Sequence, residues 1–494
     1  MEHNNGDSHT AILPTYDACL STRKKCIFCI CLSALFGIIC LGACGPILSG
    51  SAITASRTVY DAPFGGIYVA ELHPVGAHII PLLVNIVITG CTEVLGYLHA
   101  TSLRWTLIQE GNLQFNSNLR LFTTSKHTWT NGKTINIASG ALLVTCYTAS
   151  GQMFPVQGSD RVIFINGISL LMLGIGLLGL CAIAILSISA SKAAVLTWSP
   201  SPLTNALACL NNGTLVRRPG RGMMPVNMAS LPAQPTVASP SQGPAREVYK
   251  QMDVIVKYVW LALVLNCFLA GIISAITYSG GATTVNFFNN DPADDGSTNM
   301  PIGDLYWPGP LLLFCGFLFG AVVQVFLTLT LHCMELLVSV ARDEAIWRHA
   351  SSNDGAALST SALVGATQSW QWWVLFCLKP LAHWLFSSVG ISYMVSEWKP
   401  VMSFNPVPLS VLAGVTFMLV VLGEFLVNTR QHGPQPAAYG HLQTLADLID
   451  DWGAGSKGQL FWGVKSPVAG GLAKVGTSSR SNLVSAAEIG RIYS

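Results

Sequence analysis

The sequence has few charged residues for its length. Asp, Glu, Lys and Arg make up 10% of the 494 residues, whereas an ordinary soluble domain has about 25%. Lys and Arg number 26 and Asp and Glu number 24, so the chain has no basic excess that could neutralise nucleic-acid phosphates. The apolar fraction of 51% excludes an intrinsically disordered chain. These observations favour a multi-pass protein of the lipid bilayer with no nucleic-acid partner.

Motifs that hold phosphates, metals or catalytic nucleophiles are also missing. The sequence contains no Gly-x-x-x-x-Gly-Lys-Ser/Thr loop, no His-Glu-x-x-His and no Gly-x-Ser-x-Gly. Most of the 14 cysteines lie in apolar runs, and no Cys-x-x-Cys pair recurs with the histidine partners of a structural zinc site. The sequence therefore predicts neither an enzyme nor a bound metal or cofactor.

Eight apolar stretches are long enough to cross a bilayer, which takes about 20 mostly apolar residues. They lie at 26–45, 79–103, 134–150, 162–190, 257–279, 310–340, 371–395 and 407–428. Lys379 and Pro380 interrupt the seventh stretch, which we interpret either as a span or as a re-entrant segment. The bias of Lys and Arg between the loops predicts that both termini are cytoplasmic. We predict an all-α fold with about eight spans, in the plasma membrane or an endomembrane.

The starts of these stretches follow a pattern that occurs twice. Successive starts are separated by 53, 55 and 28 residues in the first four stretches and by 53, 61 and 36 residues in the last four. A Pro-x-Pro sequence follows the fourth stretch of each set, at 200–202 and at 434–436. The pattern indicates a parallel repeat of two four-helix halves, and chance similarity of loop lengths is the alternative.

The predicted spans divide the chain into five segments. These are a cytoplasmic tail at 1–25, a four-helix half at 26–190, a cytoplasmic proline-rich linker at 191–256, a second four-helix half at 257–428 and a cytoplasmic tail at 429–494. We expect disorder in the centre of the linker, at 215–245, and beyond about residue 465. Apolar residues at helical spacing predict an amphipathic helix over 442–452. This helix would dock on protein, either a cytoplasmic partner or the chain's own Arg-bearing loops.

Two long stretches on the predicted cytoplasmic side resemble signatures of a known family. The first begins at Leu103-Arg104-Trp105 and continues through residues 110–122, and the second extends from Gly433 to Trp452. Both are similar to segments of an uncharacterised family of fungal multi-pass integral membrane proteins, and the resemblance extends over residues 26–465. It implies a membrane-embedded fold and indicates no activity.

Seven ionisable residues fall within or near the predicted spans, where burial of a charge is costly. They are Glu93, His99, His332, Glu335, Lys379, His383 and Glu424. The predicted topology places the charged ones mostly in the cytoplasmic half of the membrane. One interpretation is a proton relay or a cation vestibule. The other is a structural network of ion pairs, with residues near helix ends extending to the interface.

Three cysteines, Cys26, Cys29 and Cys31, follow a basic run at the start of the first span. Reversible palmitoylation occurs at such places, and small lipid-facing residues are the alternative interpretation. Nothing in the sequence identifies a substrate. A structural, scaffolding or signalling membrane protein is the first functional hypothesis. A secondary transporter with a polar cluster toward the cytoplasmic half of the bundle is the second.

Overall fold

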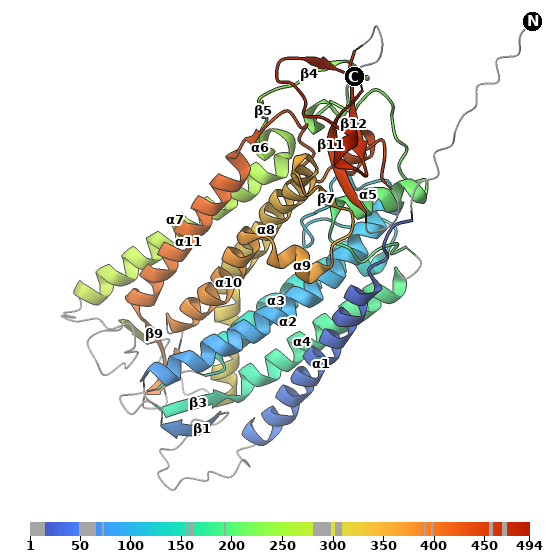
Figure 1. The fold of residues 1–494 in the computed structure, drawn as a ribbon. Helices are drawn as coiled ribbons and strands as arrows, with labels where there is room; N and C mark the ends of the chain where they lie inside the picture. The colour runs from blue at the N-terminus through green and yellow to red at the C-terminus, as the bar shows by residue number, and fades with distance from the viewer. Residues whose placement is uncertain are drawn as a thin grey trace, which may run out of the picture.

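The structure is a computed structural model in which long helices run side by side, with smaller elements at both ends of the bundle (Figure 1). It describes residues 15–48, 66–71, 74–154, 156–157, 162–191, 194–279, 298–301, 309–389, 392–396, 399–453, 458–466 and 472–494. The first 14 residues, which belong to the predicted cytoplasmic tail at 1–25, lie outside these ranges, and so do residues 280–297.

In the described part of the chain, eight helices of 19 residues or more form the bundle. They are α1 (Leu20–Leu48), α2 (Pro74–Gln109), α3 (Lys133–Gln152), α4 (Gly167–Ala190), α7 (Lys250–Ser279), α8 (Gly309–Arg348), α10 (Trp370–Ser388) and α11 (Pro406–Asn428). Among the described residues, six of these helices are long and apolar enough to cross a membrane: α1, α2, α4, α7, α8 and α11. The chain is therefore a largely helical, multi-pass membrane protein.

Two of the apolar stretches predicted as spans include a strand at one end, the fourth at its start and the seventh at its end. The fourth stretch, predicted to be helical from residue 162, begins with β3 (Val162–Asn166), and α4 follows it. The seventh stretch ends its helix at Ser388, and β8 (Ser392–Ser396) follows. The reason lies in the local sequence, because β-branched and aromatic residues such as Val-Ile-Phe-Ile favour extended backbone. Hydropathy alone does not separate these strands from the helix that adjoins them.

Two small antiparallel sheets lie at one end of the bundle. The first consists of β1 (Gly66–Glu71), β2 (Val156–Gln157) and β3, in the order β1-β3-β2. The second consists of β6 (Thr298–Pro301), β8 and β9 (Lys399–Phe404), in the order β6-β9-β8. In both sheets the central strand leads directly into a helix, α4 or α11.

An asparagine caps the helix that follows each central strand. Asn166 Oδ1 accepts hydrogen bonds from the backbone N–H groups of Ile168 and Ser169, and Asn405 Oδ1 accepts one from Val407. These contacts satisfy donors that the first turn of a helix leaves unpaired. The backbone N–H of Asn166 donates to Met153 O, and that of Asn405 donates to Val389 O. Met153 and Val389 are the C-cap residues of α3 and α10.

The helices pack in two sets of four. In the first set α4 contacts α1, α2 and α3, and in the second set α11 contacts α7, α8 and α10. The two sets meet where α3 contacts α8, where α2 contacts α10 and where α3 contacts α10. The helices α2, α3, α8 and α10 therefore form the centre of the bundle.

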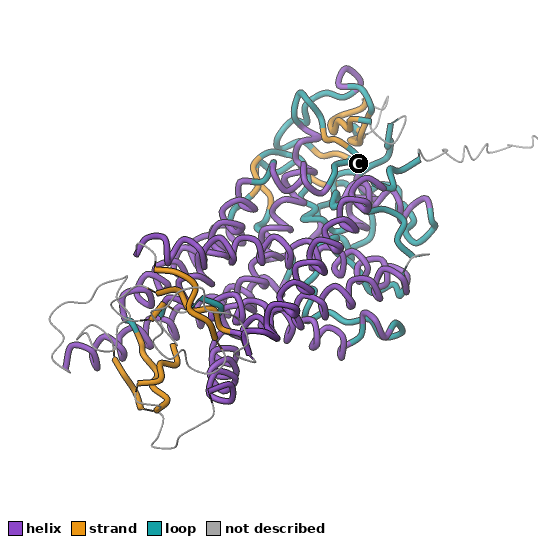
Figure 2. The backbone as a smooth tube through the Cα atoms, turned by 90° about the horizontal axis from the view of Figure 1, so that it is seen from below, coloured by secondary structure: helices purple, strands orange, loops and turns teal. Residues whose placement is uncertain are grey.

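The opposite end of the bundle has a small domain, which we call the end domain. It comprises residues 194–249, 349–367, 429–453, 458–466 and 472–494. Its helices are α5 (Pro202–Asn211), α6 (Ala245–Val248), α9 (Ala362–Thr367) and α12 (Leu442–Leu448). Its strands are β4 (Thr236–Val237), β5 (Ser241–Gln242), β7 (Ala356–Ala357), β10 (Gln431–His432), β11 (Gln459–Ser466), β12 (Lys474–Ser478) and β13 (Ile492–Tyr493). These strands pair as β12-β11-β7, β10-β5 and β13-β4. Figure 2 shows strands at both ends of the molecule and helices between them.

The sequence analysis expected disorder at residues 215–245 and in the tail beyond residue 465. The described residues of both segments are instead folded into the end domain. The structure describes 194–279 without a gap, and Met223, Met224 and Val226 are buried. Strand β4 of the linker pairs with β13 at the C-terminus of the chain. Each segment alone is too polar to form a core, but together they bury a shared cluster that includes Trp347 and Trp452. Burial between segments that are distant in sequence thus offsets the loss of conformational entropy on folding, which composition alone cannot reveal.

Candidate functional site

A buried ionic cluster lies at the centre of the bundle. Lys379 on α10 has only 2% of its surface exposed, and its ammonium contacts the carboxylates of Glu93 on α2 and Glu335 on α8. His332, one turn before Glu335 on α8, places Nδ1 2.5 Å from Glu335 Oε1. One ammonium faces two carboxylates, so these groups have a net charge of −1 unless His332 is protonated. Buried charges persist only where such partners compensate for lost hydration.

A second group of polar side chains adjoins the cluster. The imidazole of His383 on α10 stacks on the ring of Tyr147 on α3, with the ring centroids 3.7 Å apart. His383 Nδ1 is 2.9 Å from Gln324 Nε2 on α8, and the Tyr147 hydroxyl is 2.9 Å from Thr92 Oγ1 on α2. All four central helices thus contribute polar side chains to the middle of the bundle.

Two of the seven candidate residues lie outside this cluster. His99 on α2 is buried, and within the described ranges neither of its ring nitrogens has a hydrogen-bond partner. Glu424 on α11 lies at a partly exposed position between α11 and α7. Its carboxylate accepts hydrogen bonds from Trp260 Nε1 at 2.9 Å and Asn428 Nδ2 at 2.7 Å, and Arg246 lies 3.6 Å away. Glu424 therefore links two neighbouring helices and does not face the centre.

The three candidate palmitoylation sites lie inside α1, which begins at Leu20 and not at residue 26 as predicted. Cys26 is buried, Cys29 is half-buried and Cys31 is exposed. Acylation requires an accessible thiol, so this packing opposes modification of Cys26. Cys31 is exposed, as palmitoylation requires.

A cavity of about 170 Å³ opens beside the ionic cluster, between α2, α8, α10 and the loop at 117–122. Glu93, His332, Glu335 and Lys379 line it. Three arginines line it as well: Arg104, Arg120 and Arg342. The sequence did not indicate these arginines as site residues, because cations at helix ends are typical of interfacial anchors. One feature of the sequence could have indicated them, because Arg104 and Arg120 both lie in the first signature stretch.

The two signature stretches meet over this cavity. The backbone N–H of Asn116 donates to Gly440 O at 2.8 Å, and that of Leu442 donates to Gln114 O at 2.9 Å. The amide of Asn116 also donates to Asp343 Oδ2 at 2.9 Å, near the end of α8. The tail therefore holds in place the loop that lines the cavity.

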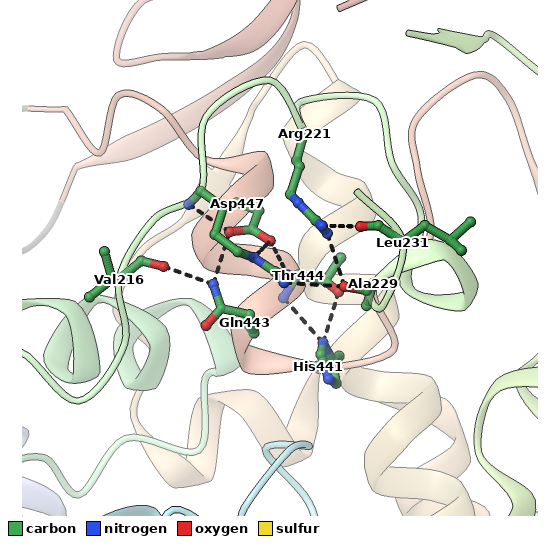
Figure 3. A network of polar contacts seen from close by, with 9 residues as sticks. Val216, Arg221, Ala229, Leu231, His441, Gln443, Thr444 and Asp447 are labelled. Carbon is green, nitrogen blue, oxygen red and sulfur yellow. Dashed lines mark hydrogen bonds and ion pairs between the residues drawn. The ribbon is translucent and has the colours of Figure 1, made fainter. Parts of the chain in front are cut away.

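The helix predicted over 442–452 is present as the shorter α12, which ends at Leu448 because Ile449 has extended backbone. Leu442, Leu445 and Leu448 are buried against α5 within the same chain. On the other face, Asp447 Oδ2 lies 2.5 Å from Arg218 Nη2. Gln443 Nε2 donates to Val216 O at 2.9 Å (Figure 3). The linker that includes Arg218 thus supplies the contacts of the tail helix.

His441 is the N-cap of α12. Its Nδ1 accepts a hydrogen bond from the backbone N–H of Thr444 at 3.1 Å and lies 2.8 Å from Thr444 Oγ1 (Figure 3). Burial, together with the nearby charge of Arg218, lowers the pKa of His441 to about 4. The neutral imidazole is therefore the form that caps the helix, because a protonated ring has no acceptor.

No protein-family model, curated protein or solved structure matches the chain. Within the described ranges, no group of three or more His, Cys, Asp or Glu side chains is placed to hold a metal ion. The fold and the site define the chain as a multi-pass helical membrane protein with a buried ionic cluster beside a polar cavity. The resemblance to a fungal family stays a prediction.

Proposed function

We propose that the protein crosses the membrane eight times as two parallel four-helix halves, α1–α4 and α7–α11, and that it acts as a secondary transporter. The end domain and both termini lie in the cytoplasm in this proposal. The topology places 21 of the 26 Lys and Arg residues on the cytoplasmic side and three outside, and the other two lie within spans.

The two additional spans in this proposal are α3 and α10. They have 20 and 19 residues, and a helix of 20 residues is about 30 Å long, which matches the apolar core of a bilayer. They are not among the six helices that composition alone marks as spans, and they contribute polar residues to the centre, Tyr147 from α3 and Lys379 and His383 from α10. Their packing among α2, α8, α4 and α11 supports the assignment, since a spanning helix surrounded by other helices can be less apolar.

Three correspondences between the halves support the repeat. The sheets β1-β3-β2 and β6-β9-β8 have the same order, and each central strand leads into an Asn-capped helix. The contacts of α4 with α1, α2 and α3 match those of α11 with α7, α8 and α10. Contacts between the halves are also reciprocal. Gln152 at the end of α3 donates to Gly316 O on α8 at 3.4 Å, and Trp384 near the end of α10 donates to His78 O on α2 at 3.1 Å.

The single observation that favours transport is the position of Lys379 between the two halves. It contacts Glu93 from the first half and Glu335 from the second half, so the ionic cluster joins the two halves. In many secondary transporters, sites for substrate and coupling ions lie at the interface between structural repeats. A movement of one half against the other would separate Lys379 from Glu93 and leave that carboxylate without its cation, which favours uptake of a proton.

The second candidate function is scaffolding or signalling, and the end domain favours it. Its core brings together the linker, the segment after α8 and the C-terminal tail, so it could present a folded surface to a cytoplasmic partner. The two functions differ in what they require of Lys379. Transport requires this side chain to change partners, whereas a scaffold requires only a stable pairing.

Flux measurements test the transport proposal. The purified full-length protein is reconstituted in liposomes that contain a pH-sensitive dye, and gradients of small solutes are applied, beginning with inorganic phosphate, succinate and sodium. We expect wild-type vesicles to change their luminal pH with at least one solute and Lys379→Gln to abolish the change. Lys257→Gln is the matched control, since Lys257 lies on α7 with 74% of its side chain exposed. Equal signals from wild type and Lys379→Gln would contradict the proposal.

A further inference from the structure

The cavity beside the ionic cluster has more cationic than anionic side chains. Arg104, Arg120, Arg342 and Lys379 line it, against Glu93 and Glu335. Lys379 is already neutralised, because its ammonium contacts both carboxylates. The second carboxylate leaves one negative charge over, so with His332 neutral the lining side chains have a net charge of +2, which the arginines supply.

Two of the arginines are partly satisfied by the protein. Arg342 Nη2 lies 3.2 Å from Asp343 Oδ1, and the other carboxylate oxygen of Asp343 accepts hydrogen bonds from Asn116 and Ser117. Arg104 is buried, with 6% of its surface exposed, and its Nη1 donates to Ser199 O at 3.3 Å. Its Nε has no hydrogen-bond partner in the described ranges. Asp343 is thus shared between structural contacts and cannot neutralise both guanidinium groups.

Arg120 is the third arginine of the cavity, and its charge acts on the carboxylates of Glu93 and Glu335. Within the described parts of the chain it forms no hydrogen bond or ion pair. Its guanidinium lies against Gly96 on α2, where a Cβ atom would be 2.8 Å from Nη1. Glycine at this position leaves the space that the guanidinium occupies. The loop at 117–122 that positions Arg120 is held by Asn116 and the tail.

We propose that this cavity binds a small oxyanion, a phosphate or carboxylate group, through Arg104, Arg120 and Arg342. Guanidinium groups present paired N–H donors that match the oxygens of such anions. The cavity volume of about 170 Å³ is smaller than the roughly 300–1,000 Å³ of sites for drug-sized ligands, so it suits a small anion or a single headgroup. Only the identification of this anion as a substrate rests on the transport function proposed above.

Binding measurements on the full-length protein in phosphatidylcholine nanodiscs test the site. Calorimetric titrations with inorganic phosphate and with succinate are carried out at constant ionic strength. Loss of a charged hydrogen bond predicts that Arg120→Gln weakens binding about ten- to hundred-fold. Gly96→Ala keeps the arginine and displaces its guanidinium, so we expect it to weaken binding at least about tenfold as well. Arg480→Gln, at an exposed position of the end domain, removes the same charge and should bind as wild type does.

A second arm distinguishes a free anion from a lipid headgroup. Phosphatidic acid is added to the nanodiscs, and the thermal unfolding midpoints of wild type and Arg120→Gln are compared. Stabilisation of wild type alone by phosphatidic acid, without binding of the soluble anions, assigns the site to a headgroup and supports the proposal. Equal binding by wild type, Arg120→Gln and Gly96→Ala overturns it, as does the absence of binding in both arms. Binding without flux refutes transport alone, and flux without Arg120-dependent binding refutes the anion site alone.

Discussion

The rings of Tyr147 and His383 stack with their planes 9° from parallel and their centroids 3.7 Å apart. Tyr147 lies six residues before Met153, the C-cap of α3, and His383 lies six residues before Val389, the C-cap of α10. One turn further along, Gly151 faces Ser387, whose Cβ would be 2.8 Å from a Cβ at Gly151. The helices α3 and α10 thus meet at equivalent positions, which is what the proposed repeat of two halves predicts.

We predict that the stack contributes to stability more through the rings than through the hydroxyl group. Tyr147→Phe removes the contact with Thr92 and should lower the free energy of unfolding by about 1 kcal/mol. Tyr147→Ala leaves a cavity at the crossing and should cost about 3–5 kcal/mol, by analogy with other large aromatic truncations. Thermal unfolding midpoints in detergent measure both effects. Tyr278→Ala, at an exposed site on α7, is the control and should have little effect.

We predict that the ionic cluster depends on mutual compensation. Lys379→Met leaves Glu93 and Glu335 without their shared cation and should destabilise the protein by about 3–5 kcal/mol. Adding Glu93→Gln and Glu335→Gln to Lys379→Met should recover most of this loss, since no unpaired charge then stays buried. Unfolding midpoints of the single and triple variants test the prediction. A triple variant no more stable than Lys379→Met alone argues against it.

Acidification should loosen the tail helix. The pKa of His441 is about 4 in the folded protein and about 6.5 in an unfolded chain, so the unfolded state binds the proton more readily. The free energy of local unfolding is therefore unaffected above pH 6.5 and falls as pH decreases from 6.5 to 4, by about 2 kcal/mol at pH 5. Hydrogen exchange of the α12 amides measures this free energy of local unfolding, once the rates are corrected for the pH dependence of intrinsic exchange. His441→Asn keeps a capping acceptor and should make exchange independent of pH over this range.

The tail should dock through the apolar face of α12. Leu445→Asp and Leu448→Asp each place a charge in a fully buried position, so we expect proteases to cleave the tail of both variants much faster than that of wild type. Leu483→Asp introduces the same charge at an exposed position of the tail and is the control. A cleavage pattern that all three variants share with wild type would count against docking.

Glycosylation tests the topology. The sequon at Asn212 follows α5 in the end domain, so it should stay unmodified in cells. Acceptor sites engineered between residues 285 and 300 should be modified, because the proposed topology places this loop outside. The measurement is a shift in electrophoretic mobility that is removed by a glycosidase. A glycan on Asn212 would reverse the proposed orientation.

Local patterns predicted the long helices better than the contacts between them. Runs such as 168–185 have no charge and are almost entirely apolar, which predicts α4 from composition alone. Lys379 and Glu93 are 286 residues apart, and no local pattern indicates that they pair. For the same reason the sequence did not predict an ordered linker, because its order depends on the pairing of β4 with β13 near the C-terminus. The predicted depth in the membrane also did not show which ionisable residues lie together. Glu424, which was grouped with the others by depth, lies on α11 away from the centre of the bundle.

The most direct test of the transport account is whether the two halves move against each other. Spin-labelled unnatural amino acids at Gln109 and Ala345, exposed near the ends of α2 and α8, report this distance by pulsed electron resonance without using the native cysteines. The account predicts two distance populations in wild type, with a ratio that changes when Lys379→Gln removes the contact between the halves. A single narrow distance, unchanged by Lys379→Gln, would contradict alternating access and favour a scaffold.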